Sequence, residues 1–129
     1  MFVRTPEDVK QKQMTMPGAL GVQMRLMIGR EDGAPTFAMR LFDVEPGGQT
    51  PLHAHNYEHE VLILSGSGEV TGGPDGKIQK KIQQGNVIFM PANELHQFRN
   101  TGNQTLQFMC LVPTQFDCGG GVCEATPGS

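Results

Sequence analysis

Short runs of alternating apolar and polar residues dominate this chain and predict β-strands. The first two clear runs are Val22–Ile28 and Thr36–Val44, closed by Gly29 and by Pro46-Gly47-Gly48. A period of two places every second side chain on one face of a strand, as in a sheet with one buried face. Later runs cover 59–64, 68–71, 77–82, 86–90, 95–99 and 105–112, with turn residues between them. Seven or eight short strands without a helical stripe are typical of a sandwich or small barrel, so the pattern predicts an all-β fold.

The two ends of the chain lack this alternation. Residues 1–18 include two prolines and are predicted to form an N-terminal arm, whereas 19–113 form the barrel. Residues 114–129 are rich in glycine and short of large apolar side chains, so we expect a loosely held C-terminal tail. Cys118 and Cys123 lie in that tail. Their spacing would suit a small disulfide or a stray metal ion, but two unpaired thiols are the preferred interpretation.

Composition and charge narrow the function classes. A length of 129 residues allows one ordinary domain, and 17 glycines with 9 prolines fit many tight turns. A net charge of −3 supplies no broad positive field for a phosphate backbone, so nucleic acid is not an expected partner. The longest apolar stretch, Phe108–Val112, is too short for a membrane helix. With no hydrophobic signal region at the start and an odd number of cysteines, we expect a soluble cytoplasmic protein with reduced thiols.

Three of the four histidines fall within seven residues, which is the most specific chemical feature of the sequence. His53 and His55 are two apart, so on an extended segment both project from one face, with Cα atoms roughly 7 Å apart. Imidazoles at that spacing can close on one metal ion at about 2.1 Å. His59 has the same parity and opens a predicted strand, whereas Glu60 would point away. We therefore predict a metal site, with His96 as a further candidate from a separate strand.

The residues around the histidines resemble the two sequence motifs of the cupin family. The first motif is matched by Gly47, His53, His55, His59 and Gly66, and the second by Gly85, Pro91, Asn93, His96 and Asn100. Asn93 stands where the motif usually has glycine, at a turn position whose left-handed backbone asparagine tolerates. The resemblance covers residues 47–100 and implies a single-domain cupin jelly roll, a double-stranded β-helix barrel with metal ligands pointing into its lumen.

Within the family, the ligand set resembles that of small four-histidine cupins that hold manganese. The customary glutamate ligand falls on His59 by spacing, and the first motif reads His-x-His-x-x-Glu-His-Glu in both. The resemblance implies metal ligation by His53, His55, His59 and His96, with Glu60 as the rival fourth ligand. Manganese is the preferred divalent ion, and iron, cobalt, nickel, copper and zinc are alternatives.

Four neutral imidazoles would leave the charge of a divalent ion uncompensated, and a six-coordinate ion would keep two neighbouring positions open. We therefore expect a metal-dependent oxidoreductase of the dioxygenase type, acting on a small organic substrate. Two alternatives stay open. One is a non-redox isomerisation or ring opening of a sugar or uronate, and the other is a module that binds a small ligand without chemistry.

Four residues near the ligands are candidates for catalysis. Arg40 would clamp a substrate carboxylate if it points inward, or would be a solvated arginine if it points outward. Tyr57 lies between two ligands and would bond a substrate at the mouth or cover the rim. Glu60 would act as a base or orient an imidazole, as would Glu58. The four-histidine resemblance places Cys110 near the metal, and a plain buried thiol is the simpler interpretation.

Cupins of this size commonly pair, so a homodimer is the expected assembly. The resemblance implies that a strand from the N-terminal arm joins the sheet of a neighbouring copy. Alternatively, the arm covers an edge of its own barrel.

Overall fold

The structure is a computed structural model of the 129-residue chain, and it describes residues 1–117. Residues 118–129 lie outside the described part, so the alternatives for Cys118 and Cys123 stay predictions. Within the described part, the regular elements are β-strands and three short 3₁₀ turns, η1 (Pro6–Asp8), η2 (Arg30–Asp32) and η3 (Thr114–Phe116). No helix there has the length and hydropathy needed to cross a lipid bilayer.

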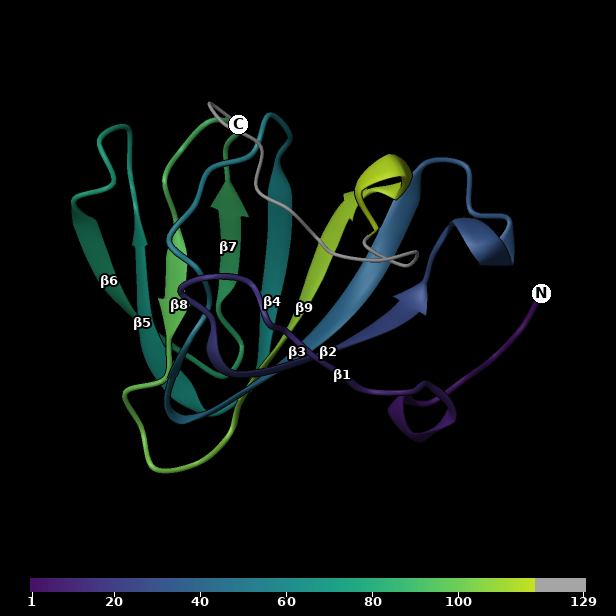
Figure 1. Ribbon diagram of the computed structural model, residues 1–129, viewed down its shortest axis with the longest axis horizontal. Helices are drawn as coiled ribbons and strands as arrows, with labels where there is room; N and C mark the ends of the chain where they lie inside the picture. Colours follow the sequence, from purple (N-terminus) through teal and green to yellow (C-terminus); the bar gives the residue numbers. More distant parts are fainter. Residues whose placement is uncertain (118–129) are drawn as a thin grey trace.

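The strands of residues 1–117 form one sheet that curls on itself. They are β1 (Lys12–Gln13), β2 (Leu20–Ile28), β3 (Phe37–Gln49), β4 (His59–Ser65), β5 (Ser67–Gly72), β6 (Ile78–Gln83), β7 (Val87–Met90), β8 (Gln97–Arg99) and β9 (Leu106–Pro113). The hydrogen-bonded order is β6-β5-β8-β3-β9-β4-β7, with β2 and β1 added beside β3. Figure 1 shows β5, β6 and β8 on one side of the molecule and β2, β3 and β9 on the other. The predicted all-β class is confirmed.

Alternating burial along the strands builds a core between the two sides of the curled sheet. On β9 every second side chain is buried: Leu106, Phe108, Cys110 and Val112. Phe108 stacks between Phe42 of β3 and Phe98 of β8, with ring centroids 5.1 and 4.7 Å away. Because β8 and β9 belong to opposite sides, this three-ring stack joins the sides and fills part of the lumen with apolar groups.

Strand β3 differs from the prediction, because it does not end at Pro46-Gly47-Gly48 but continues to Gln49. Gly47 has a φ of 80°, a left-handed conformation that favours glycine. A Cβ atom on Gly48 would meet two backbone oxygens within 3 Å. The body of β3 pairs with β9, and its last residue pairs with Arg99 of β8. The glycines that resemble a stop signal therefore form the corner at which β3 passes from one side of the barrel to the other.

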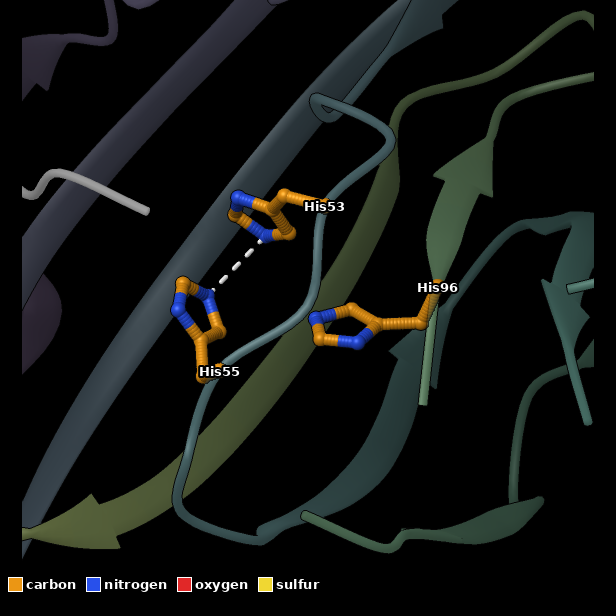
Figure 2. A group of neighbouring side chains, drawn as sticks. All are labelled: His53, His55 and His96. Carbon is orange, nitrogen blue, oxygen red and sulfur yellow. Dashed lines mark hydrogen bonds between the residues drawn. The ribbon is translucent and has the colours of Figure 1, made fainter. Parts of the chain in front are cut away.

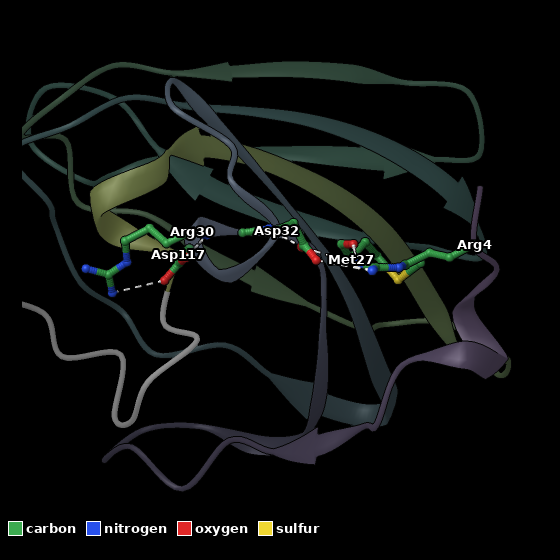
Figure 3. Close-up of polar contacts among 6 residues, drawn as sticks. Arg4, Met27, Arg30, Asp32 and Asp117 are labelled. Atoms are coloured by element: carbon green, nitrogen blue, oxygen red, sulfur yellow. Dashed lines mark hydrogen bonds and ion pairs between the residues drawn. The ribbon is translucent and has the colours of Figure 1, made fainter. Parts of the chain in front are cut away.

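The N-terminal arm lies against its own barrel. Strand β1 pairs with β2 in antiparallel register. The Arg4 guanidinium donates to the Met27 carbonyl oxygen at 2.7 Å and forms an ion pair with Asp32 at 3.1 Å, as Figure 3 shows. Within the single chain, the arm therefore contacts its own barrel through β1 and Arg4, and its role towards a neighbouring copy stays a prediction.

The first residues after β9 are packed against the barrel. Thr114 and Asp117 are buried, in and just after η3. The Asp117 carboxylate accepts a hydrogen bond from the Arg30 backbone N–H at 2.8 Å and pairs with the Arg30 guanidinium at 3.3 Å, also visible in Figure 3. A buried carboxylate with these partners anchors residues 114–117 to the barrel, and the expected loose tail stays a prediction for the residues that follow.

Replacing Gly68 by alanine is expected to destabilise the barrel by about 2–3 kcal/mol. A Cβ atom there would overlap the Arg99 carbonyl oxygen on the neighbouring strand β8. Gly72→Ala on the same strand is the matched control, because its Cβ atom would first meet the Met90 methyl carbon at 3.4 Å, an ordinary contact. Urea unfolding should give a change below about 1 kcal/mol for the control. Equal losses for the two variants would contradict the close approach of β5 and β8.

Candidate metal centre

The four histidines come from three segments of the chain and meet in the lumen. His53 and His55 lie in the loop between β3 and β4, His59 is the first residue of β4, and His96 directly precedes β8. A β-bridge joins His53 to His96. The backbone nitrogen of His53 lies 3.1 Å from the His96 carbonyl oxygen, and the backbone nitrogen of His96 lies 2.8 Å from the His53 carbonyl oxygen. In five of the six pairs of these rings, the centroids lie between 4.1 and 5.4 Å apart. The fold thus brings all four predicted ligands into one cluster.

Three of these side chains have the geometry of a metal site. One ring nitrogen each from His53, His55 and His96 lies within 4.8 Å of the others. The Nε2 atoms of His53 and His55 are 3.1 Å apart and face each other in Figure 2. Two nitrogen donors bound at right angles to one ion at about 2.1 Å stand about 3.0 Å apart. These residues therefore fit a divalent transition metal.

The contacts of the His96 and His59 rings leave one nitrogen of each ring available for a metal. His96 Nδ1 lies 3.0 Å from the Glu94 carbonyl oxygen, so Nδ1 carries the proton and Nε2 keeps its lone pair. His59 Nδ1 lies 3.2 Å from Cys110 Sγ. The Nε2 atom of His59 is buried and has no hydrogen-bond partner among the described residues. A buried nitrogen without a partner is costly in a protein alone, and a bound ion would satisfy it.

The electrostatic environment keeps the imidazoles neutral, which is the form that binds metals. Burial, followed by the neighbouring imidazoles and Arg40, lowers the pKa of His53 to about 4 and that of His55 to about 3. Burial, with Arg40 as the next cause, lowers the pKa of His59 to about 2. Burial also lowers the pKa of His96, partly offset by its hydrogen bond to the Glu94 backbone.

Arg40 and Cys110 are both buried beside the histidines. Arg40 points inward from β3, and its guanidinium lies over the Phe42 ring and 3.4 Å from Cys110 Sγ. This decides between the two orientations considered for Arg40. Cys110 is its cross-strand partner on β9 and faces the same lumen. A buried guanidinium adds a fixed positive charge to the site, and the thiol is near enough to contact both Arg40 and His59.

Tyr57 covers one side of the cluster as part of an aromatic stack. Its ring is parallel to the His55 ring at 4.7 Å and to the Phe116 ring at 3.9 Å. Burial raises the pKa of the Tyr57 hydroxyl. Phe116 belongs to the segment expected to be loose, and the sequence analysis missed it. The available signal was a large aromatic side chain immediately after the last strand, in a stretch otherwise poor in apolar groups.

Glu58 and Glu60 do not join the cluster. Both side chains are exposed. Glu60 pairs in register with Phe89 and Leu111 and occupies the opposite face of β4 from His59. The alternation of a regular strand therefore places His59 in the lumen and its acidic neighbour outside.

The cavity at the histidines is small and has no acidic wall. Its volume is about 40 Å³, and it is lined by Met14, Arg40, Phe42, Thr50, Pro51, the four histidines, Phe98, Phe108 and Cys110. None of these lining residues of the described part is Asp or Glu. A larger hollow of about 540 Å³ lies elsewhere, between β6 and β7, and no histidine lines it. The histidine cluster therefore lies at the smaller of these two cavities.

Relatives among known proteins agree with this architecture. The chain is 37% identical to auxin-binding protein 1 of Arabidopsis thaliana over 86% of its length, and 32% identical over 87% to an oxalate-binding protein of Thermotoga maritima. It is 32% identical over 64% of its length to 1-methylthio-D-xylulose 5-phosphate methylsulfurylase of Rhodospirillum rubrum. The chain spans 58% of the auxin-binding protein and 51% of the methylsulfurylase, but 93% of the oxalate-binding protein.

Solved structures give the same picture and identify the family. The polyketide cyclase RemF of Streptomyces resistomycificus superposes with a TM-score of 0.82 at 34% identity, covering 98% of this chain and 82% of that one. A predicted oxalate decarboxylase of Thermotoga maritima superposes with a TM-score of 0.77 at 26% identity, covering 88% and 99%. The family model described as the cupin domain matches residues 40–112, which hold all four histidines, Arg40 and Cys110. The chain therefore belongs to the cupin family.

Proposed function

We propose that this protein is a metal-dependent cupin enzyme that closes a ring without net oxidation. The enolate carbon of a 1,3-dicarbonyl unit would form a carbon–carbon bond to another carbonyl carbon of the same substrate, and the oxygen of that carbonyl would leave with two carbon-bound protons as water. The observation that carries the proposal is the cavity wall: four uncharged imidazoles, one buried guanidinium and apolar rings, with no carboxylate among the described lining residues. Such a wall favours an anionic oxygen ligand, and an enolised 1,3-dicarbonyl presents two such oxygens. Similarity to a polyketide cyclase over 98% of the chain supports this chemistry.

The proposed ligands are His53, His55, His59 and His96, with manganese preferred and iron, cobalt, nickel, copper and zinc as alternatives. The grouped nitrogens of three of them and the buried Nε2 atom of His59 support this set. A bound divalent ion would supply Lewis acidity that stabilises an enolate. Because the set contains no carboxylate, the ion's full charge would act on the substrate.

The residues of the chain itself would bind, orient and shield the substrate. The Arg40 guanidinium is placed to stabilise negative charge on a carbonyl oxygen, and its burial strengthens that interaction. The rings of Phe42, Phe98 and Phe108 would exclude water from the substrate oxygens that enter the cavity of about 40 Å³. Tyr57 at the side of the cluster is the proposed hydrogen-bond donor to a substrate oxygen.

Two earlier alternatives have less support. None of the relatives named above is described as a dioxygenase, so that activity stays a prediction. Isomerisation of a sugar or uronate needs a base that removes a weakly acidic proton from one carbon and returns it to another, whereas the acidic carbon-bound proton of a 1,3-dicarbonyl can pass to solvent. Glu58 and Glu60, the bases considered for it, are exposed rather than part of the cavity wall.

Benzoylacetone, a 1,3-diketone, tests whether the site stabilises an enolate, the step on which the proposed ring closure depends. Titrated under argon into manganese-loaded protein, it should give the absorption band of its enolate at a pH where the unbound diketone is protonated. The metal-free protein is the control and should give no band. Arg40→Gln should weaken binding about tenfold, because it removes a charge-assisted hydrogen bond. Absence of the band, or manganese-dependent oxygen uptake with this substrate, would refute the non-redox proposal.

A second candidate is the binding of a small dicarboxylate such as oxalate without turnover. The small cavity, about 40 Å³, favours it, and so does similarity to an oxalate-binding protein along 93% of that protein's length. Calorimetry with oxalate and benzoylacetone on the same manganese-loaded protein separates the two candidates. Tight oxalate binding without formation of formate or carbon dioxide, together with no diketone binding, would select the binding module.

Replacing Cys110 by valine is expected to weaken manganese binding about tenfold. The Sγ atom lies 3.2 Å from His59 Nδ1, and holding the proton on Nδ1 leaves Nε2 as the metal-binding nitrogen. Cys110→Ser keeps a hydrogen-bond acceptor and should retain most of the affinity. Val112→Ala, at a buried position on the same face of β9, is the control for lost packing. Isothermal titration should find no change for the control, and equal losses in the serine and valine variants would contradict the positioning role.

We also propose a homodimer, with the arm staying on its own barrel. An apolar hollow of about 280 Å³ on the outer face of β4, β7 and β9, bounded in part by Leu62, Met109 and Leu111, supports a contact between barrels. A chain lacking residues 1–12 should therefore remain a dimer, as measured by light scattering. Dissociation of the truncated chain into monomers would instead mean that the arm joins the neighbour's sheet.

A further inference from the structure

A large hollow forms a groove between the two edge strands of the sheet. Strands β6 and β7 end the hydrogen-bonded path, and the groove of about 540 Å³ lies between them. Val70, Ile82 and Met90 line it and are buried core residues. Ile78 and Phe89 line it as well but are 47% and 58% exposed. The groove is therefore an apolar hollow open to solvent, with a volume typical of small-molecule sites.

Lys80 is an exposed charged residue on this largely apolar surface. Lys80 lines the groove and pairs in register with the buried Val70. Alternation along β6 puts Lys80 on the same face as Ile78 and Ile82, whereas Lys77 precedes the strand and does not line the groove. No ion pair within residues 1–117 engages Lys80. An ammonium group beside an apolar floor is complementary to an anion attached to an apolar body.

The only acidic lining residue of the described part does not neutralise this lysine in the structure. Glu94 lies at the groove, and its carboxylate accepts a hydrogen bond from the Gly73 backbone N–H at 3.0 Å. Lys81 also lines the groove, so the charged lining residues comprise two lysines and one glutamate. This positive excess is local, because the whole chain has a net charge of −3.

We propose that the groove between β6 and β7 is a second binding site, which takes an elongated apolar molecule with a carboxylate at one end and uses Lys80 as its counter-ion. The site is separate from the metal centre. The two cavities share no lining residue, and Met90, the cross-strand partner of His59, belongs to the wall of the groove. Binding in the groove therefore does not need the metal, and its test is independent of the proposed cyclase function.

Decanoate and decan-1-ol are the probes, because they share a chain and differ in charge. Calorimetry on the metal-free full chain should show decanoate binding more tightly than the alcohol. Lys80→Met keeps the apolar stem and removes the charge, so it should weaken decanoate binding about tenfold and leave the alcohol unchanged. Lys77→Met is the matched control and should change neither, because Lys77 precedes β6 and does not line the groove. Equal decanoate binding by the wild-type and Lys80→Met proteins would overturn the proposal, as would no binding at all.

A filling variant tests the location by a second route. A Cβ atom on Gly72 would lie 3.4 Å from the Met90 methyl carbon without a clash, so Gly72→Val should fold and occupy the groove. It should lower decanoate affinity at least tenfold while manganese binding stays unchanged. Methyl NMR should show decanoate-induced shifts at Met90 and not at Met109, which lines the outer hollow. Shifts at Met109 alone, or full decanoate binding by a folded Gly72→Val protein, would overturn the assignment.

Discussion

Replacing His53, His55 or His96 by alanine should lower the affinity for manganese about 100-fold or more, the largest functional loss expected from any single change. These three residues contribute nitrogens that already lie within 4.8 Å of one another, so the fold has organised the site before an ion arrives. Removing one imidazole takes away one metal–nitrogen bond, while the surroundings of the remaining imidazoles stay equally buried. Isothermal titration of metal-free protein, with metal content measured after dialysis, checks the result.

The same experiment distinguishes three ligands from four. His59→Ala should lose nearly as much affinity as the other alanine variants if its buried Nε2 atom binds the ion. Glu60→Gln is the matched control, because this exposed carboxylate was the rival fourth ligand and faces away from the cavity. Wild-type affinity for His59→Ala would reduce the site to three histidines. A loss for Glu60→Gln as large as that for His53→Ala would contradict the position of Glu60 on the outer face.

The metal-free protein should lose stability steeply as the pH falls from neutral towards 4. The unfolded chain takes up protons at these histidines near the ordinary pKa of 6.5, whereas burial lowers the folded-state pKa of His53 to about 4 and that of His55 to about 3. Between those values the unfolded state binds more protons, so the free energy of unfolding decreases as the pH decreases. Each histidine that is protonated only in the unfolded chain contributes up to about 1.4 kcal/mol per pH unit.

Urea unfolding of metal-free protein at pH 7, 5.5 and 4.5 measures this effect. Saturating manganese at pH 7 should raise the free energy of unfolding, by about 4 kcal/mol when the metal concentration is 1,000 times the dissociation constant. Acid should remove this added stability, because protons compete for the same nitrogens. His55→Gln provides the control for the proton effect, since it replaces one titrating ring with an amide of similar polarity and should flatten the slope. A stability of the metal-free wild type that does not change over this range would contradict burial of the neutral rings.

Residue spacing alone was enough to predict the strands and the histidine cluster. Strands β4 to β9 begin and end within two residues of the alternating runs, because a period of two is a local consequence of having one buried face. His53, His55 and His59 share a parity within one short segment, and that parity is retained in the fold. The local pattern also separated His59 from Glu60 before any tertiary contact was known.

Contacts between distant segments could not be predicted in this way. The orientation of Arg40 stayed open because a single arginine in an alternating strand is compatible with either face, and only the pairing of β3 with β9 places it against Cys110. Pro46-Gly47-Gly48 has the composition of a turn, and its use as a strand corner depends on the two sides that β3 connects. Phe116 stacks on Tyr57 across nearly half the chain, so no local signal predicted that contact.

The sequence by itself therefore determined the all-β class, the positions of most strands and the shared parity of His53, His55 and His59, since those properties follow from short-range periodicity and spacing. The addition of His96 as a fourth predicted ligand rested on the resemblance to the cupin motifs. Only the tertiary structure decided what surrounds the histidines: a buried guanidinium, a thiol beside His59, an aromatic stack and no carboxylate among the described wall residues. Those features depend on register and curvature, which bring together residues up to 70 positions apart.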